Sequence, residues 1–85
     1  MITRMIGIVN RVLDEEIRLQ VGPFEYQVLI PEVTRRSLQE KVGLEVVLHI
    51  VEYLEGNQSG SRMVPRRIGF LTEDDLEFFE LFCTV

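Results

Sequence analysis

The sequence has no tryptophan, one cysteine and one histidine among its 85 residues. With Cys83 alone, no disulfide can form within the chain, which fits a reducing compartment. Acids and phenylalanines flank this cysteine, and such surroundings disfavour the thiolate that a nucleophilic role requires. No Cys/His spacing suits zinc, and the six glycines form neither a G-x-G-x-x-G nor a Walker pattern. We therefore expect no metal, no cofactor and no catalytic residues in this chain.

Long apolar runs are also missing, so we expect no transmembrane helix and no membrane association. The first residues show no basic segment followed by an apolar stretch and a cleavage site. This predicts no secretory signal and a cytoplasmic location. A chain of 85 residues with 46% hydrophobic content allows one domain with a single core and argues against disorder.

Positive charge is absent from residues 72–85, where five acids account for the whole net charge of −5. Residues 1–71 carry all nine basic residues and nine acids, so their charges cancel. A domain that bound phosphates through its overall field would be basic. Any binding of nucleic acid must therefore come from local geometry, a partner or sequence outside this chain.

Residues 16–31 (EIRLQVGPFEYQVLIP) are predicted to form the β-hairpin around which the chain is organised. Ile17, Leu19 and Val21 alternate with polar residues, which is the period-two pattern of a strand with one buried face. A Gly-Pro pair interrupts the alternation, and the pattern then resumes as far as Pro31. That proline ends the strand because it has no N–H to give to a sheet.

Three further segments have strand patterns. Residues 2–13 are apolar on both faces and contain Gly7, which predicts a bulge or a sharp bend. Residues 45–54 show the strongest strand pattern and are also apolar on both faces. Residues 63–70 return as a fifth strand, whose early part Pro65 places at an edge or makes irregular. Between these two strands, residues 55–62 are rich in turn formers and predict a mobile hairpin tip.

A short helix is predicted over residues 33–42, with Thr34 as its N-cap and Gly43 as its C-cap glycine. Its expected apolar stripe consists of Val33, Leu38 and Val42.

A second helix is predicted over residues 72–85. Thr72 is the expected N-cap, with Asp75 three residues later, and acids in the first turn suit the helix dipole. The expected apolar stripe consists of Leu76, Phe79 and Phe82 with Cys83, widened by Phe78 and Leu81.

The predicted order, β-β-β-α-β-β followed by a helix, is that of an OB-fold barrel. We therefore predict one mainly β domain, with a five-stranded barrel in residues 1–71 and a C-terminal helix in residues 72–85. Another small five-stranded barrel is the alternative. A barrel of this size encloses only one face of residues 45–54, so the other face predicts a homo-oligomer. That outer face consists of Val47, His49, Val51 and Tyr53.

Most of the candidate functional residues also have a simpler structural interpretation. A lone histidine in an apolar strand, such as His49, is more often a packed residue than a ligand or a base. Aromatic residues at alternating positions can stack on bases, but core or subunit packing explains them better. Three arginines near one hairpin end are either solvated or in contact with a DNA backbone. These aromatic and basic residues are Phe24, Tyr26, Tyr53, Arg62, Arg66 and Arg67.

Four segments resemble, in order, the N-terminal domain of RuvA, the junction-binding subunit of the bacterial Holliday-junction branch-migration complex. They are MITRMIGIV, VGPFEYQVLIP, LHIVEYLEG and the IGF that precedes an F-x-x-L-F helix. The resemblance covers residues 1–85. It implies an OB-fold that assembles as a tetramer and serves DNA recombination and repair as the non-ATPase subunit beside a RuvB motor. It also implies that DNA-gripping helix-hairpin-helix motifs and a motor-binding domain follow residue 85 in a longer protein.

Two departures from the family pattern affect the expected DNA contacts. Family members carry adjacent carboxylates, the acidic pin, on the hairpin after the LHIV-like strand, where they face the junction centre. The matching residues here, Glu52 and Glu55, are not adjacent, and an insertion carrying Arg62, Arg66 and Arg67 makes the tip net positive. The usual G-V-G-Y turn of the first hairpin is replaced by GPFEY.

From the residues and the resemblance together we predict a scaffold for four-way DNA junctions. The chain would act within a homo-tetrameric RuvA-like protein whose partner is a RuvB-like ATPase. The alternatives are a generic OB module that binds single-stranded nucleic acid, and a domain that serves oligomerisation alone.

Overall fold

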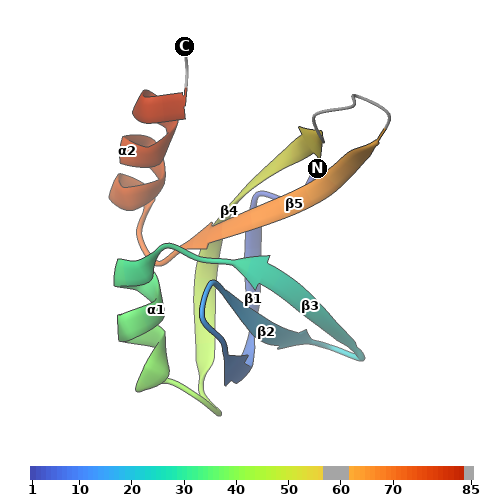
Figure 1. The fold of residues 1–85 in the computed structure, drawn as a ribbon. Coiled ribbons are helices and arrows are strands. Elements are labelled where there is room, and N and C mark those ends of the chain that lie inside the picture. The colour runs from blue at the N-terminus through green and yellow to red at the C-terminus, as the bar shows by residue number, and fades with distance from the viewer. Residues whose placement is uncertain (57–61, 84–85) are drawn as a thin grey trace.

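The computed structural model describes residues 1–56 and 62–83, which form a closed five-stranded barrel with two helices (Figure 1). Around the barrel the strands follow the order β1-β2-β3-β5-β4. This architecture confirms the predicted mainly β, OB-type fold. The elements are β1 (Arg4–Val12), β2 (Glu16–Val21), β3 (Phe24–Leu29), α1 (Glu32–Gln39), β4 (Glu45–Gly56), β5 (Met63–Phe70) and α2 (Glu73–Cys83).

β1 closes the barrel because it is shared between two neighbours. Its first half, Arg4 to Ile8, pairs with β4, and its second half pairs with β2. The register irregularity of β1 lies between Val9 and Arg11, so the prediction of a bulge at Gly7 is wrong. Gly7 instead allows close approach, since a Cβ there would lie 2.4 Å from the carbonyl oxygen of Gln20.

The predicted hairpin is confirmed. β2 and β3 pair in continuous register, and the pair Val21 and Phe24 closes a turn of two residues, Gly22 and Pro23. Gly22 adopts a φ of +58°, a left-handed conformation that costs glycine little. The inward-facing residues are fully buried at the base of the hairpin, as at Ile17, and become exposed toward the turn.

Beyond the barrel, β4 and β5 continue as a two-stranded antiparallel ribbon, visible in Figure 1 as the long pair of arrows. We call residues 51–56 of β4 with residues 63–67 of β5 "the ribbon". β3 pairs with β5 at one position, Leu29 with Ile68, in parallel orientation. Pro65 therefore lies in an edge segment, as predicted. The strands extend to the pair Gly56 and Met63, further than predicted, and the rest of the expected tip, residues 57–61, lies outside the described residues.

The core consists of inward-facing strand residues and one helix residue. Alternate residues of β4 fill the interior, whereas Val47 points outward with 41% of its surface exposed, so the two-faced prediction for this strand is confirmed. The buried cluster comprises Met5, Val9, Ile17, Leu19, Val28, Ile30, Leu38, Val46, Leu48 and Ile50.

The details predicted for α1 are wrong. The helix begins one residue earlier, after Pro31, and Thr34 is a buried residue inside it rather than its N-cap. It ends at Gln39 with Glu40 as C-cap. Gly43 has a φ of +86° but lies in the following turn, where its N–H donates to the carbonyl of Val9 at 2.8 Å.

The expected apolar stripe of α1 is reduced to Leu38, which is fully buried in the core. Val33 is 74% exposed, and Val42 is half exposed and lies beyond the helix. The buried face is instead Thr34 and Leu38, one helical turn apart.

α2 packs on the outside of β4 and β5. Its predicted N-cap is confirmed, because the backbone N–H of Asp75 donates to Oγ1 of Thr72 at 3.1 Å. Phe79 of α2 packs against Phe70, with ring centroids 5.2 Å apart.

The predicted inward stripe of α2 is wrong at Phe82, which is 70% exposed and packs edge-on against Phe78. Phe78, Leu81 and Phe82 are the large exposed apolar residues of this helix, and the side chain of Cys83 lies outside the described part. Within residues 1–56 and 62–83, neither helix has the length and apolar character needed to cross a bilayer.

Candidate nucleic-acid interface

The ribbon carries both acidic candidates and two of the three arginines, Arg66 and Arg67, and Arg62 immediately precedes its second strand. Cross-strand neighbours on an antiparallel pair point to the same face, and successive residues of a strand point to opposite faces. Glu52 lies opposite Arg67, on the face that continues the barrel interior. Tyr53 lies opposite Arg66, on the outer face.

Glu52 is held by two groups at the base of the ribbon. Its Oε1 accepts a hydrogen bond from the backbone N–H of Ile2, and its Oε2 lies 3.2 Å from Nε of Arg67. The Nε of Arg67 is buried and lacks the alignment of a hydrogen bond, so this contact is an ion pair only. The guanidinium of Arg67 also lies 5.5 Å from the ring centroid of Tyr26, in cation–π geometry.

Glu55 forms a looser pair on the outer face. Its Oε1 lies 3.3 Å from Nε of Arg66, and its side chain is 53% exposed. Exposed ion pairs of this kind contribute about 0–1 kcal/mol. The pKa of nearby Glu16 is lowered, first by a hydrogen bond from Gln27 and more weakly by Arg18 and the field of Arg66. Charge on this side of the ribbon is therefore largely balanced.

The structure thus separates the two acidic candidates instead of bringing them together. Glu52 and Glu55 lie on opposite faces, and each faces an arginine. Arg66 and Arg67 likewise point to opposite faces because they are adjacent in one strand. Arg62 is exposed and immediately precedes β5. The odd spacing of the two glutamates in the sequence already implied this separation.

The outer face of β4 forms a partly apolar surface. Val47 is exposed, while His49, Val51 and Tyr53 are half-buried. Ile6 of β1 lies directly opposite Val47 and is 46% exposed, so it extends this surface. Sequence reasoning did not include Ile6 in the interface, although the second apolar face of its strand was a signal for it.

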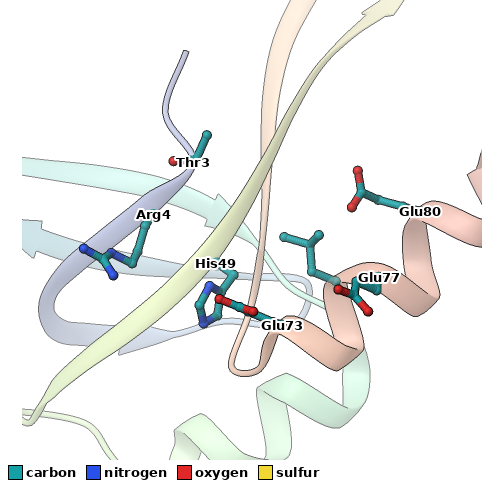
Figure 2. Close-up of a pocket in the computed structure, with 7 residues that line it drawn as sticks. Thr3, Arg4, His49, Glu73, Glu77 and Glu80 are labelled. Carbon is teal, nitrogen blue, oxygen red and sulfur yellow. The ribbon is translucent and has the colours of Figure 1, made fainter.

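His49 lines an open cleft of about 580 Å³ between the strands and α2 (Figure 2). It is half-buried rather than enclosed in the core. The other lining residues are Thr3, Arg4, Glu73, Leu76, Glu77 and Glu80. Among the described residues, no three His, Cys, Asp or Glu side chains are grouped so that they could hold a metal ion.

Comparison with known proteins decides the family. No family model matches the sequence. The Holliday junction branch migration complex subunit RuvA of Rhodopirellula baltica is 44% identical over 85 residues, and that of Desulfosudis oleivorans is 37% identical over 86. Both alignments cover the whole of this chain. The chain belongs to the RuvA family.

The aligned region is the N-terminal part of both RuvA relatives. This chain spans 41% and 40% of their lengths, about two fifths in each case. Within the RuvA family, it therefore corresponds to an N-terminal domain.

Proposed function

We propose that this barrel is the N-terminal domain of a cytoplasmic protein that binds four-way DNA junctions during branch migration, in recombination and repair. The observation that carries the proposal is the similarity along the whole chain to two RuvA subunits whose names specify this complex. The barrel supplies a scaffold, and a RuvB-like ATPase supplies the energy. This division of roles agrees with the absence of any catalytic constellation in the sequence.

The proposal includes a longer protein, since the relatives are more than twice as long as this chain. Helix-hairpin-helix motifs of the family would follow α2 and bind the DNA backbones. The exposed apolar face of α2, with Phe78 and Phe82, would then be covered by those motifs.

The ribbon is the part of this chain that we assign to the DNA. Glu52 and Glu55 are each neutralised by an arginine, so the exposed Arg62, which immediately precedes the ribbon strand β5, makes this end of the ribbon net positive. A positive ribbon suits contact with phosphates, whereas the acidic pin of the family repels them. Since one or a few contacts neutralise few phosphates, the isolated chain should bind DNA weakly.

A competition gel shift tests this function. The proteins are this chain alone and a chimera in which it replaces the aligned part of the R. baltica relative, and the probes are four-way junction, duplex and single-stranded DNA. The chimera should prefer the junction, and the isolated chain should show no sub-micromolar binding. A chimera that prefers single strands would indicate a single-strand-binding OB module. Absence of DNA binding by the chimera would leave oligomerisation as the function.

The ribbon contact is tested by substitution in the same chimera. Arg62→Ala should weaken junction binding. It should also reduce the slope of log K against log salt concentration by about one. The matched control is Arg36→Ala, which removes an exposed arginine from α1 and should have no effect. Equal effects of both substitutions would mean that the ribbon has no specific contact with DNA.

We also propose self-association through the outer face of β4, with a homo-tetramer as the assembly. The support is the surface formed by Ile6, Val47, Val51 and Tyr53. Val51→Glu or Tyr53→Glu should yield a folded monomer in sedimentation equilibrium. Val33→Glu, which changes a 74% exposed residue on α1, is the control and should leave the assembly intact. A strictly monomeric unmodified chain at high concentration would contradict this proposal.

A further inference from the structure

We propose that Glu52, Arg67 and Tyr26, together "the anchor cluster", fix the direction in which the ribbon leaves the barrel. Glu52 is then a positioning residue that acts through Arg67 and is not a carboxylate presented to DNA. The link to DNA recognition rests on the proposed function, but the positioning role itself is a property of the folded chain.

The anchor cluster joins three segments that have no sheet pairing with one another at the base of the ribbon. Tyr26 belongs to β3, Glu52 and Arg67 belong to the base of the ribbon, and Ile2 precedes β1. The guanidinium of Arg67 lies 5.5 Å from the Tyr26 ring centroid and its Nε lies 3.2 Å from Glu52. The N–H of Ile2 donates to the other oxygen of Glu52.

The barrel needs such a connection here because β3 and β5 diverge. They pair at Leu29 and Ile68 only, and a gap of about 60 Å³ opens beside that pair. Gln27 and Leu29 of β3 line it on one side, and Pro65, Arg66 and Arg67 of the ribbon line it on the other. An isolated two-stranded ribbon is marginally stable and more strongly twisted than a wider sheet, so its own hydrogen bonds do not set its angle to the barrel. A contact between the ribbon and β3 does set that angle.

The second ion pair of the ribbon provides an internal comparison. Arg66 and Glu55 both belong to the ribbon, so their 3.3 Å contact stays the same whatever angle the ribbon adopts. Arg67 is adjacent to Arg66 but reaches the barrel through Tyr26. Two neighbouring arginines therefore have different roles, and only one of them should affect the ribbon direction.

The chemistry of the cluster predicts which substitutions it tolerates. A planar guanidinium stacks on an aromatic ring and pairs with a carboxylate at the same time, which an ammonium does less well. Tyr26→Phe keeps the ring face and should preserve the geometry. Tyr26→Leu, Arg67→Gln and Glu52→Gln each remove one contact and should release the ribbon.

The ribbon direction can be measured as a distance between two spin labels. We would label Gln39→Cys at the end of α1 and Val64→Cys in the ribbon, both exposed positions, in a Cys83→Ser background. Dilution with unlabelled chain removes distances between copies. With the unmodified cluster, pulsed electron–electron double resonance should give one narrow distribution of distances between the two labels. Tyr26→Leu, Arg67→Gln and Glu52→Gln should each lose that single narrow peak.

Two controls separate positioning from general stability. Arg66→Gln and Tyr26→Phe should retain the narrow peak, and the unfolding temperature of the barrel identifies any variant that fails to fold. If Arg67→Gln does not fold, Arg67→Lys takes its place and should broaden the peak in a folded protein. A narrow, unshifted peak in every folded variant of the cluster, or equal broadening by Arg66→Gln, would overturn the proposal.

The same variants, placed in the chimera, keep this inference distinct from the proposed function. A ribbon released in the spin-label measurement, in a chimera that never prefers junctions, would leave the anchor cluster established and the DNA role refuted. If the chimera preferred junctions but the label distance stayed the same in Tyr26→Leu, Arg67→Gln and Glu52→Gln, the anchor cluster alone would be refuted.

Discussion

The two halves of β4 belong to one strand but are held in place by different forces. In the barrel half, Leu48 is fully buried and packs with the other apolar core residues. In the ribbon half, Leu54 is 62% exposed and its strand has β5 as its sheet neighbour. Sheet pairing in β4 thus continues where core packing has ended, and polar contacts then position the strand.

Apolar burial in the barrel half also stabilises the fold more than the ion pairs of the ribbon half do. Full burial of a leucine side chain is worth about 1.5–3 kcal/mol, whereas an exposed ion pair contributes about 0–1 kcal/mol. The barrel should therefore supply most of the free energy of unfolding. The ribbon depends on the barrel for its stability and retains exposed apolar and charged side chains for contacts with other molecules.

The largest expected effect tests this division directly. Leu48→Ala should lower the free energy of unfolding by about 2–5 kcal/mol, because it leaves a cavity in the core. Leu54→Ala, the same substitution in the ribbon, should change it by less than about 0.5 kcal/mol. Urea denaturation measures both. Comparable losses would mean that the ribbon is part of the cooperative core.

A second, smaller effect concerns glycines in the same two regions. Gly7→Ala should destabilise the barrel by about 1–3 kcal/mol, because the new Cβ would lie 2.4 Å from a backbone oxygen of Gln20. In the ribbon, the Cβ added by Gly56→Ala would lie 2.8 Å from the sulfur of Met63, which can move aside, and at an ordinary 3.7 Å from the backbone oxygen of Arg62. Thermal unfolding should therefore separate the two variants, and equal transition temperatures would argue against close strand approach at Gly7.

The third prediction compares α2 with the barrel that it covers. Thr72→Ala removes the acceptor for the N–H of Asp75 and should destabilise α2 by about 1 kcal/mol. Hydrogen exchange should accelerate in α2 amides and stay unchanged in the amides of β1. Ser37→Ala, an exposed change inside α1, is the control. Uniform acceleration along the chain would show that α2 and the barrel unfold as one unit.

The smallest effect involves charges on the surface of α1. Arg35 donates two hydrogen bonds to Glu32, at 2.8 and 2.5 Å, and these bonds, with the charge of Arg35 and a weaker contribution from Arg36, lower the pKa of Glu32 from 4.5 to about 2. A carboxylate whose folded pKa is depressed contributes stability above its unfolded pKa and loses it as the pH falls from about 4.5 to about 2. In the Glu32→Gln variant, the free energy of unfolding should therefore fall less steeply as the pH drops through this window.

Because Glu32 is exposed, solvent screening keeps this contribution small. Arg35→Gln should reproduce most of the change, since it removes two of the three hydrogen bonds that Glu32 accepts and leaves the one from Arg36. Urea midpoints measured between pH 2 and pH 6 provide the test. If the urea midpoint changed with pH in the same way in all three proteins, the ion pair would contribute nothing to stability in solution.

Most of the barrel could be predicted from local patterns. Strict alternation identified the hairpin and the inward face of β4, because burial on one side of a strand imposes a period of two. The Thr72 cap followed from local chemistry in the same way. The caps of α1 failed because Thr34 is drawn into the core together with Leu38, a tertiary effect that outweighs its capping preference.

The candidate site was less predictable because it depends on cross-strand register. The pairing of Glu52 with Arg67 joins residues 15 positions apart, and the contact with Tyr26 joins two different hairpins. No periodicity within one segment encodes such contacts. The cluster of acids and arginines in the sequence thus resolves into separate pairs on opposite faces once the strands are paired.

Photo-crosslinking from the end of the ribbon to a four-way junction tests whether this part of the chain contacts the DNA crossover. A benzophenone group replaces Arg62 in the chimera with the R. baltica relative, and a second protein carries the group at Arg36 on α1. We expect crosslinks from position 62 to nucleotides at the crossover, and few from position 36. Crosslinks from position 62 confined to the ends of the duplex arms, or equal labelling from both positions, would contradict that contact.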